Sequence, residues 1–225
     1  MSDAVQRWRV IHRREATTTE LGQRSELGAW EAAFAAGGLP VAVDGRGRAR
    51  LGGGIPLPVG LTAEAERIDV LLAERWTAGA VRRAVVEAAP AGHPIVDVYD
   101  VWLGEPPLVA VIVAADYRLT IDPVDETELR RATTELLAAD RLERTRSKGG
   151  TSRSYDLRPL LIDARAGQAS VWLRLRADPT GGVGRPDEAL AEIGDRLGRS
   201  LTMIAGVRER LWLTDELGEV GDRPG

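Results

Sequence analysis

The chain has 225 residues, 44% of them hydrophobic and 28% charged, which is typical of a globular protein. The absence of cysteine excludes disulfides, thiolate zinc sites and cysteine-ligated iron–sulfur clusters within it, and neither of its two histidines, His12 and His93, has a recognisable partner. We therefore expect no metal and no cofactor. No apolar run approaches the roughly 18 residues of a membrane span, so we expect a cytoplasmic protein without a membrane contact.

Hydrophobic periodicity divides the first half of the chain into elements in the order β-α-β-β-β-α-β. The predicted strands cover residues 7–11, 41–43, 50–55, 68–72 and 95–103. A helix capped within residues 17–20 carries Leu27, Trp30 and Phe34, and a second helix begins after Thr77. The regular spacing favours core packing for the indole rings of Trp8, Trp30, Trp102 and Trp172, with base stacking as the alternative for Trp172 beside Arg174 and Arg176.

The segment from Gly104 to Pro107 interrupts this pattern, and the same order of elements then recurs. A strand at 117–121 precedes a helix whose Asp125 and Glu128 have capping-box spacing. The remaining predictions are a hairpin from 141–146 and 154–157 around Lys148, a strand at 171–176, a helix between Pro186 and Gly198, and a strand at 207–213. We expect the polar tail from about residue 216 to be flexible.

Two halves with one element order predict an α+β fold of two tandem ferredoxin-like β-α-β-β-β-α-β units, each an antiparallel sheet covered by two helices. The first unit would span residues 1–104 and the second residues 105–225. The alternative is one continuous sheet that both halves share.

Four short motifs follow one another along the chain. They are Ile55-Pro56-Leu57-Pro58-Val59-Gly60 with Thr62, Ala65, Glu66, Asp69 and Val70; Trp102-Leu103 with Pro106 and Ala115-Asp116-Tyr117; Tyr155-Asp156-Leu157-Arg158-Pro159; and Gly184-Arg185-Pro186-Asp187. In this order they resemble the radical-SAM-associated (radical-SAM-linked) family of bacterial proteins of unknown function, over about residues 6–213. The resemblance implies a link to radical SAM proteins, because family members are typically fused to them or encoded beside them.

Two segments depart from the family pattern. Thr18-Thr19-Glu20-Leu21 stands where relatives have an aromatic-Leu-Ser entry to the first helix, and Asp44-Gly45-Arg46-Gly47-Arg48 replaces a Ser-Gln-Gly-Phe-Asn-Pro-like loop. A radical SAM enzyme holds its cluster with three cysteines, and this chain has none. The resemblance therefore implies a radical SAM partner in trans rather than radical chemistry in this chain.

Arginine supplies the candidate anion sites, since Lys148 is the one lysine among 30 basic residues. A genome rich in G and C is the alternative source of this bias. Arg46, Arg48 and Arg50 lie in a glycine-rich loop that could approach phosphate, although it lacks the Gly-Lys-Ser/Thr ending of a P-loop. The alternative for this loop is a solvated hairpin.

The predicted hairpin forms a second basic surface, with six basic and three acidic residues between Asp140 and Arg158. Its candidate RNA or anion contacts are Arg144, Arg146, Lys148, Arg153 and Arg158. The alternative is a solvated strand edge protected by charge. Arg185 precedes a helix and could hold an anion at its N-terminus, although helix entry alone accounts for that segment.

Acidic residues give weaker signals, and no catalytic residue is assigned. Asp156 and Arg158 stand two apart, so on a strand their side chains could form a structural or functional ion pair. Glu64, Glu66 and Asp69 could act as acid and base or hold magnesium, but nothing in the sequence brings them to one pocket.

Together these features favour a non-catalytic accessory or substrate-binding module that acts with a separate radical SAM enzyme, with RNA as the candidate ligand. The alternative is a cysteine-free RNA-modifying enzyme that uses an acidic residue such as Asp156. The net charge of −4 argues against non-specific binding of nucleic acid by the whole surface, and no feature indicates specificity for DNA.

Overall fold

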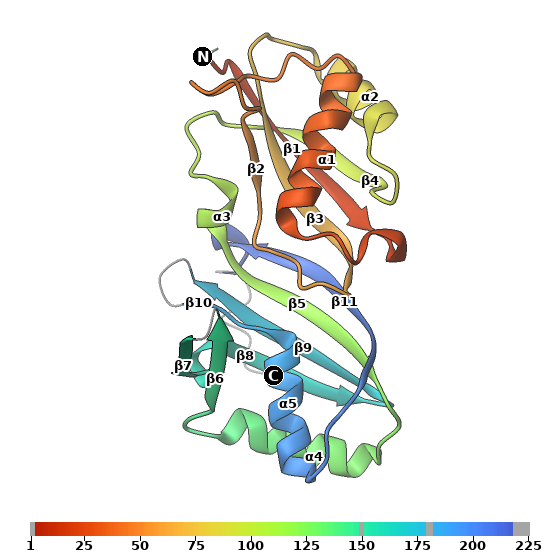
Figure 1. The fold of residues 1–225 in the computed structure, drawn as a ribbon, viewed down its shortest axis with the longest axis vertical. Helices are drawn as coiled ribbons and strands as arrows, with labels where there is room; N and C mark the ends of the chain where they lie inside the picture. The colour runs from red at the N-terminus through yellow and green to blue at the C-terminus, as the bar shows by residue number, and fades with distance from the viewer. Residues whose placement is uncertain (1–2, 149–150, 179–181, 218–225) are drawn as a thin grey trace. The chain divides into compact units, whose positions relative to one another are not determined.

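The computed structural model describes residues 3–148, 151–178 and 182–217, and the chain divides into two compact units, Met1–Ile112 (unit 1) and Val113–Gly225 (unit 2). Each unit has a mainly antiparallel sheet and two long helices (Figure 1). The predicted α+β class is confirmed. The narrower assignment to tandem ferredoxin-like units, and a domain division at Gly104, stay predictions.

Unit 1 is built on an antiparallel sheet with the strand order β4-β1-β3-β2. Its elements in chain order are β1 (Gln6–Arg14), the 3-10 turn η1 (Ala16–Thr18), α1 (Gln23–Ala36), β2 (Leu51–Gly53), β3 (Thr62–Leu72), α2 (Ala78–Ala88), β4 (Ile95–Val101) and the short helix α3 (Leu108–Val111). The predicted strand at 41–43 is reduced to isolated bridges at Val41 and Val43.

The two faces of this sheet differ because side chains alternate along each strand. One face packs against α1 and α2, and its buried core consists of Trp8, Val10, Trp30, Phe34, Leu39, Ile68, Val70, Leu72, Val81, Val85 and Val98. Arg7 and Arg9 alternate with Trp8 and Val10, so they lie on the opposite, polar face. Unit 1 therefore has an apolar face under its helices and a polar face carrying charged side chains.

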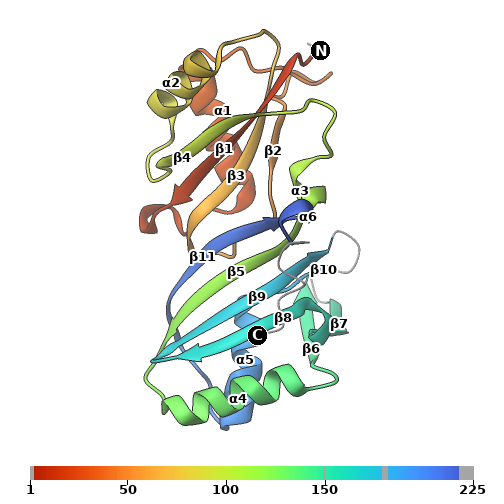
Figure 2. The same ribbon diagram turned by 180° about the vertical axis from the view of Figure 1, so that it is seen from behind.

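Unit 2 has the strand order β11-β5-β9-β8, with β10 also paired to β9. Its elements are β5 (Ile112–Ile121), α4 (Glu126–Ala138), β6 (Glu143–Lys148), β7 (Thr151–Asp156), η2 (Arg158–Leu160), β8 (Leu161–Gly167), β9 (Ser170–Asp178), β10 (Gly182–Val183), α5 (Pro186–Leu197), β11 (Met203–Leu213) and α6 (Thr214–Leu217). Figure 2 shows α4 and α5 lying together beside this sheet. Leu129 and Leu136 from α4 and Ile193 from α5 are buried, as are Leu173 and Leu175 from β9.

Most of the predicted helix limits are confirmed. Thr77 caps α2 by accepting a hydrogen bond from the Ala80 N–H, and Asp125 caps α4 by accepting one from the Glu128 N–H at 3.0 Å. Pro186 begins α5 and Gly198 follows its last residue. The predicted cap within residues 17–20 is wrong, because the Thr18 hydroxyl donates to the Glu15 carbonyl and closes η1 instead.

Other predictions need correction or fall outside the described residues. The Trp102 ring is 75% exposed, so its predicted place in the core is wrong, and β8 is a strand that the hydrophobic pattern does not predict. The hairpin of β6 and β7 is confirmed, with its turn at residues 149–150 outside the described part. Glu216 and Leu217 complete α6, and the rest of the expected flexible tail is also outside it. None of the described helices is long and apolar enough to cross a membrane.

Candidate functional site

The loop between α1 and β2 is an ordered turn that presents arginine. Val43 pairs with Ala49, and the Gly47 N–H donates to the Asp44 carbonyl at 3.0 Å, with Gly47 at a φ of 75° that favours glycine. The Asp44 carboxylate accepts backbone hydrogen bonds from Arg48 at 3.0 Å and Arg46 at 2.7 Å, and these lower its pKa below the ordinary value. The carboxylate therefore organises the backbone of the loop.

The three arginine side chains of this loop, Arg46, Arg48 and Arg50, are exposed. Among the described residues their guanidinium groups make no hydrogen bond or ion pair. The predicted anion site at this loop thus has three guanidinium groups in solvent. Their donors remain available to a ligand from outside the chain.

A groove of about 470 Å³ adjoins this loop on the polar face of unit 1. Arg50, Gly52 and Gly53 line one part of it, and Leu103 and Val109 line another. Leu103 and Val109 are 42% and 48% exposed, and Trp102, next to Leu103 in the chain, is 75% exposed. Trp102 does not line the groove itself, and its ring lies against Gly104, between the lining residues Leu103 and Glu105.

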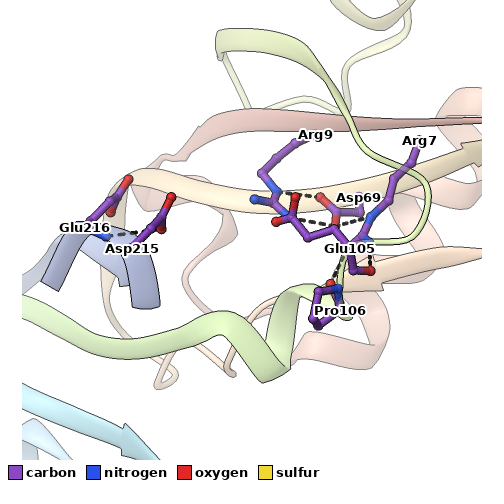
Figure 3. A network of polar contacts seen from close by, with 7 residues as sticks. All are labelled: Arg7, Arg9, Asp69, Glu105, Pro106, Asp215 and Glu216. Atoms are coloured by element: carbon purple, nitrogen blue, oxygen red, sulfur yellow. Dashed lines mark hydrogen bonds and ion pairs between the residues drawn. The ribbon is translucent and has the colours of Figure 1, made fainter. Parts of the chain in front are cut away.

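Arg7 and Asp69 also line the groove. They belong to a buried network in which the positive charges of the arginines are matched by carboxylates (Figure 3). Asp69 accepts from the Arg7 Nε at 2.9 Å and the Arg9 Nε at 2.8 Å, and Arg7 also donates to the Glu105 carbonyl at 2.6 Å. Burial acts to lower the pKa of Arg9, but the hydrogen bonds and charge of Asp69 raise it above the ordinary value. These arginines hold the segment around Glu105 against the sheet.

Two arginines of the predicted basic surface on the β6–β7 hairpin, Arg144 and Arg158, have partners within unit 2. Arg144 donates to Glu192 at 3.1 Å and to Asp195 at 2.9 Å. Arg158 donates to the Leu137, Ala139 and Leu161 carbonyls, so it holds the C-terminal end of α4. Arg146 and Arg153 pair in register, but their side chains, with that of Lys148, lie outside the described part of the structure.

Asp156 is a structural carboxylate rather than half of the predicted ion pair. Its Oδ1 accepts from the Leu142 N–H at 2.8 Å and from the Arg158 backbone N–H at 3.0 Å, whereas the Arg158 side chain points to carbonyls. The hydrogen bond from Leu142, followed by that from Arg158, lowers the pKa of Asp156. A general acid needs the opposite shift, so this geometry gives no support to catalysis by Asp156.

Two further candidates also have ordinary structural roles. Arg185 pairs with Asp187 at 3.0 Å beside the first turn of α5, so its guanidinium already has an anionic partner. Glu66 and Asp69 stand three apart on β3 and therefore on opposite faces of the sheet. The structure does not bring these two carboxylates into one pocket, and the sequence contains no signal that would do so.

Sequence reasoning missed a cluster of His12, Glu26 and His93, whose ligand atoms all lie within 4.8 Å of one another. Burial lowers the pKa of His12 to about 4 and also lowers that of His93, which keeps both rings neutral near pH 7. The expectation that these histidines lack partners is wrong. The sequence contains half of the signal, because the alternation of β1 places His12 on the same inward face as Trp8 and Val10. The loop that brings His93 to His12 has no hydrophobic periodicity, so the sequence does not predict their contact.

A comparison with protein families matches residues 48–186 to the family described as an uncharacterized protein conserved in bacteria (DUF2344). The chain belongs to this family. No curated protein matches this DUF2344 chain. The family description agrees with the resemblance to bacterial proteins of unknown function, and it does not mention radical SAM proteins.

Two solved structures are similar to this DUF2344 chain at low sequence identity. One is a Cbf5–Nop10–Gar1 complex, with 12% identity, a TM-score of 0.48 and coverage of 90% of this chain and 48% of the other. The second is the archaeal box H/ACA sRNP Nop10–Cbf5 complex, with 10% identity, a TM-score of 0.45 and coverage of 90% and 47%. The DUF2344 chain thus spans about half the length of the solved chains that it matches.

Proposed function

We propose that this protein is a non-catalytic module that binds single-stranded RNA through the loop of residues 44–54 and the adjoining groove, which we call the arginine groove. The observation that carries the proposal is the combination of three unpaired guanidinium groups with the exposed Trp102 ring in unit 1. Unpaired arginines could contact successive phosphates, and an exposed indole could stack on an unpaired base.

The distribution of charged partners favours the arginine groove over the β6–β7 hairpin as the RNA-binding surface. Arg144 and Arg185 already have carboxylate partners in unit 2, so an RNA phosphate would have to displace them. Asp44 is the one carboxylate of the 44–54 loop, and its Oδ1 is directed to backbone N–H groups. A local basic surface of this kind is compatible with a chain whose net charge is −4.

The accessory role rests on chemistry as well as charge. Cysteine-ligated radical chemistry is excluded within this chain, and the hydrogen bonds of Asp156 do not suit an acid catalyst. The ordered motifs that resemble the radical-SAM-linked family support a separate radical SAM enzyme as the partner that would act on the bound RNA. Co-purification from the native cell extract, with proteins and RNA both identified, tests that partnership.

The arginine groove is tested by fluorescence anisotropy with a labelled single-stranded RNA of mixed sequence, titrated at several salt concentrations from about 50 mM. Counterion release makes the logarithm of affinity fall with the logarithm of salt by about 0.7 per phosphate contact on a single strand. Replacing Arg46, Arg48 and Arg50 together by Ala should therefore reduce the slope by about 2.

The matched control replaces Arg118, Arg130 and Arg131 by Ala, which changes the net charge equally but removes arginines that already pair with Glu209, Glu126 and Glu135. This control should leave the slope nearly unchanged. An equal reduction of the salt-dependence slope in both triple variants would show non-specific attraction of RNA to the protein's charge. That result would reject the arginine groove as the binding site. No binding by the unaltered protein at about 50 mM salt would remove RNA as the ligand.

A further inference from the structure

His12, Glu26 and His93 come from three separate elements of unit 1 and meet beside its core. His12 lies on β1, Glu26 in the first turn of α1, and His93 in the loop between α2 and β4. The two histidine side chains are 2% and 1% exposed, and Glu26 is 13% exposed. The Nε2 atoms of His12 and His93 lie 3.8 and 3.9 Å from the same Glu26 oxygen, Oε1. Three donor atoms therefore surround one small volume.

The orientation of both rings follows from their other nitrogen atoms. The His12 Nδ1 lies 3.0 Å from the Arg13 carbonyl, and the His93 Nδ1 lies 3.0 Å from the Ala91 carbonyl. A carbonyl oxygen can only accept a hydrogen bond, so each Nδ1 carries the proton and each neutral ring has its lone pair at Nε2. The buried His93 Nε2 makes no hydrogen bond to the described residues. Histidines that bind metals commonly hold their second nitrogen in this way.

Neighbouring side chains fix the third donor and leave room for a small ligand. Arg14 donates to the other Glu26 oxygen, Oε2, at 3.2 Å. Arg14 is itself held by hydrogen bonds to the Thr18 and Leu21 carbonyls, so it fixes the position of the Glu26 carboxylate. A cavity of about 20 Å³ next to the cluster is lined by His12, Glu26, Trp30 and Glu66 among others. That volume is enough for about one water molecule.

We propose that the Nε2 atoms of His12 and His93 and a carboxylate oxygen of Glu26 bind one divalent first-row transition metal ion, best zinc, in unit 1. Two imidazoles and one carboxylate form a donor set that suits zinc and related ions, with a water molecule as the fourth ligand. Bond lengths of about 2.0–2.1 Å would bring tetrahedral donors about 3.4 Å apart. The donor atoms, which lie 3.8–4.8 Å apart, therefore need to close by about 0.4–1.4 Å. This inference is independent of the proposed RNA contact.

The decisive experiment uses the full chain after treatment with EDTA and titrates it with zinc chloride. Isothermal calorimetry should show one site per chain. Because the chain has only two histidines, a carbon–proton NMR correlation of the imidazole rings should show both sets of signals shifting together up to one equivalent of zinc. Cobalt chloride in place of zinc should give the visible absorption of a tetrahedral or five-coordinate site.

Two variants each remove one donor, His93→Gln and Glu26→Gln, and each should weaken zinc binding by about 100-fold or more, since even outer-shell changes cost 10–100-fold. Glu20→Gln, the same chemical change at an exposed position, should leave binding unaltered. Binding that survives both donor variants overturns the proposal. If either variant fails to fold, the unaltered chain still decides, because imidazole signals that do not move with zinc reject the site.

Discussion

At the residue scale, Arg9, Arg158 and Arg48 show how the role of an arginine follows from what its guanidinium group contacts. Arg9 is buried against Asp69 and holds the polar face of unit 1 together. Arg158 donates to the carbonyls at the end of α4, where a positive charge also complements the helix dipole. Arg48 is exposed and makes no hydrogen bond or ion pair of its guanidinium with the described residues. Only this third role leaves donors for a ligand.

Gly92 precedes His93, and replacing it tests whether the loop that carries His93 has the close-packed geometry seen in the structure. Its φ is 74°, and an added Cβ would lie 2.5 Å from Thr18 Cγ2. We expect Gly92→Ala to lower the free energy of unfolding by about 1–3 kcal/mol, measured by urea denaturation. Gly79→Ala is the control, because its Cβ would meet open space in α2 and should be neutral or slightly stabilising. Equal stability of the two variants would contradict this description of the loop.

At the element scale, the β6–β7 hairpin is joined to α5 by charge. Arg144 is 23% exposed at its side chain, and its partner Glu192 is 10% exposed, so the pair is partly withdrawn from water. Glu192 also pairs with Arg196 at 2.7 Å, which places one carboxylate between two guanidinium groups. The hairpin arginine therefore contributes to folding within unit 2.

Replacing Arg144 by Ala should consequently lower the free energy of unfolding by about 1 kcal/mol, because it removes one partner of a partly buried carboxylate. Arg141→Ala is the matched control, since Arg141 is 68% exposed and lies 3.9 Å from Glu143. Chemical denaturation of both variants measures the difference. An unchanged midpoint for Arg144→Ala would mean that the ion pair with α5 is too solvated to matter.

Local signals predicted the elements better than the sites. Thr77, Asp125 and Pro186 mark helix starts correctly because caps and proline act on the adjacent backbone. Trp102 shows the limit of periodicity, since β4 ends at Val101 and the ring that follows is exposed. The partners of Arg144 on α5 and of Glu26 at His93 are distant in sequence, so no local pattern could reveal them.

At the scale of the whole molecule, the net charge is −4, and many arginines of the described part already pair with carboxylates, among them Arg118, Arg130 and Arg131. Arg144 of the predicted basic hairpin pairs with carboxylates in this way, whereas the arginines of the 44–54 loop do not. The two faces of the unit 1 sheet then carry separate chemistry: the donor cluster lies beside the core under α1, and the arginine groove lies on the polar face. Gly53 lines both cavities, but the arginine substitutions change no donor of the cluster, and the donor substitutions change no arginine of the groove.

Ultraviolet crosslinking with mass spectrometry tests most directly whether RNA contacts the arginine groove. The unaltered full chain is irradiated with single-stranded RNA at about 50 mM salt, where electrostatic contacts are strong. We predict crosslinked peptides that contain residues 44–54 or Trp102, and their loss when Arg46, Arg48 and Arg50 are replaced by Ala. Crosslinks confined to the β6–β7 hairpin, or none at all, would contradict this assignment.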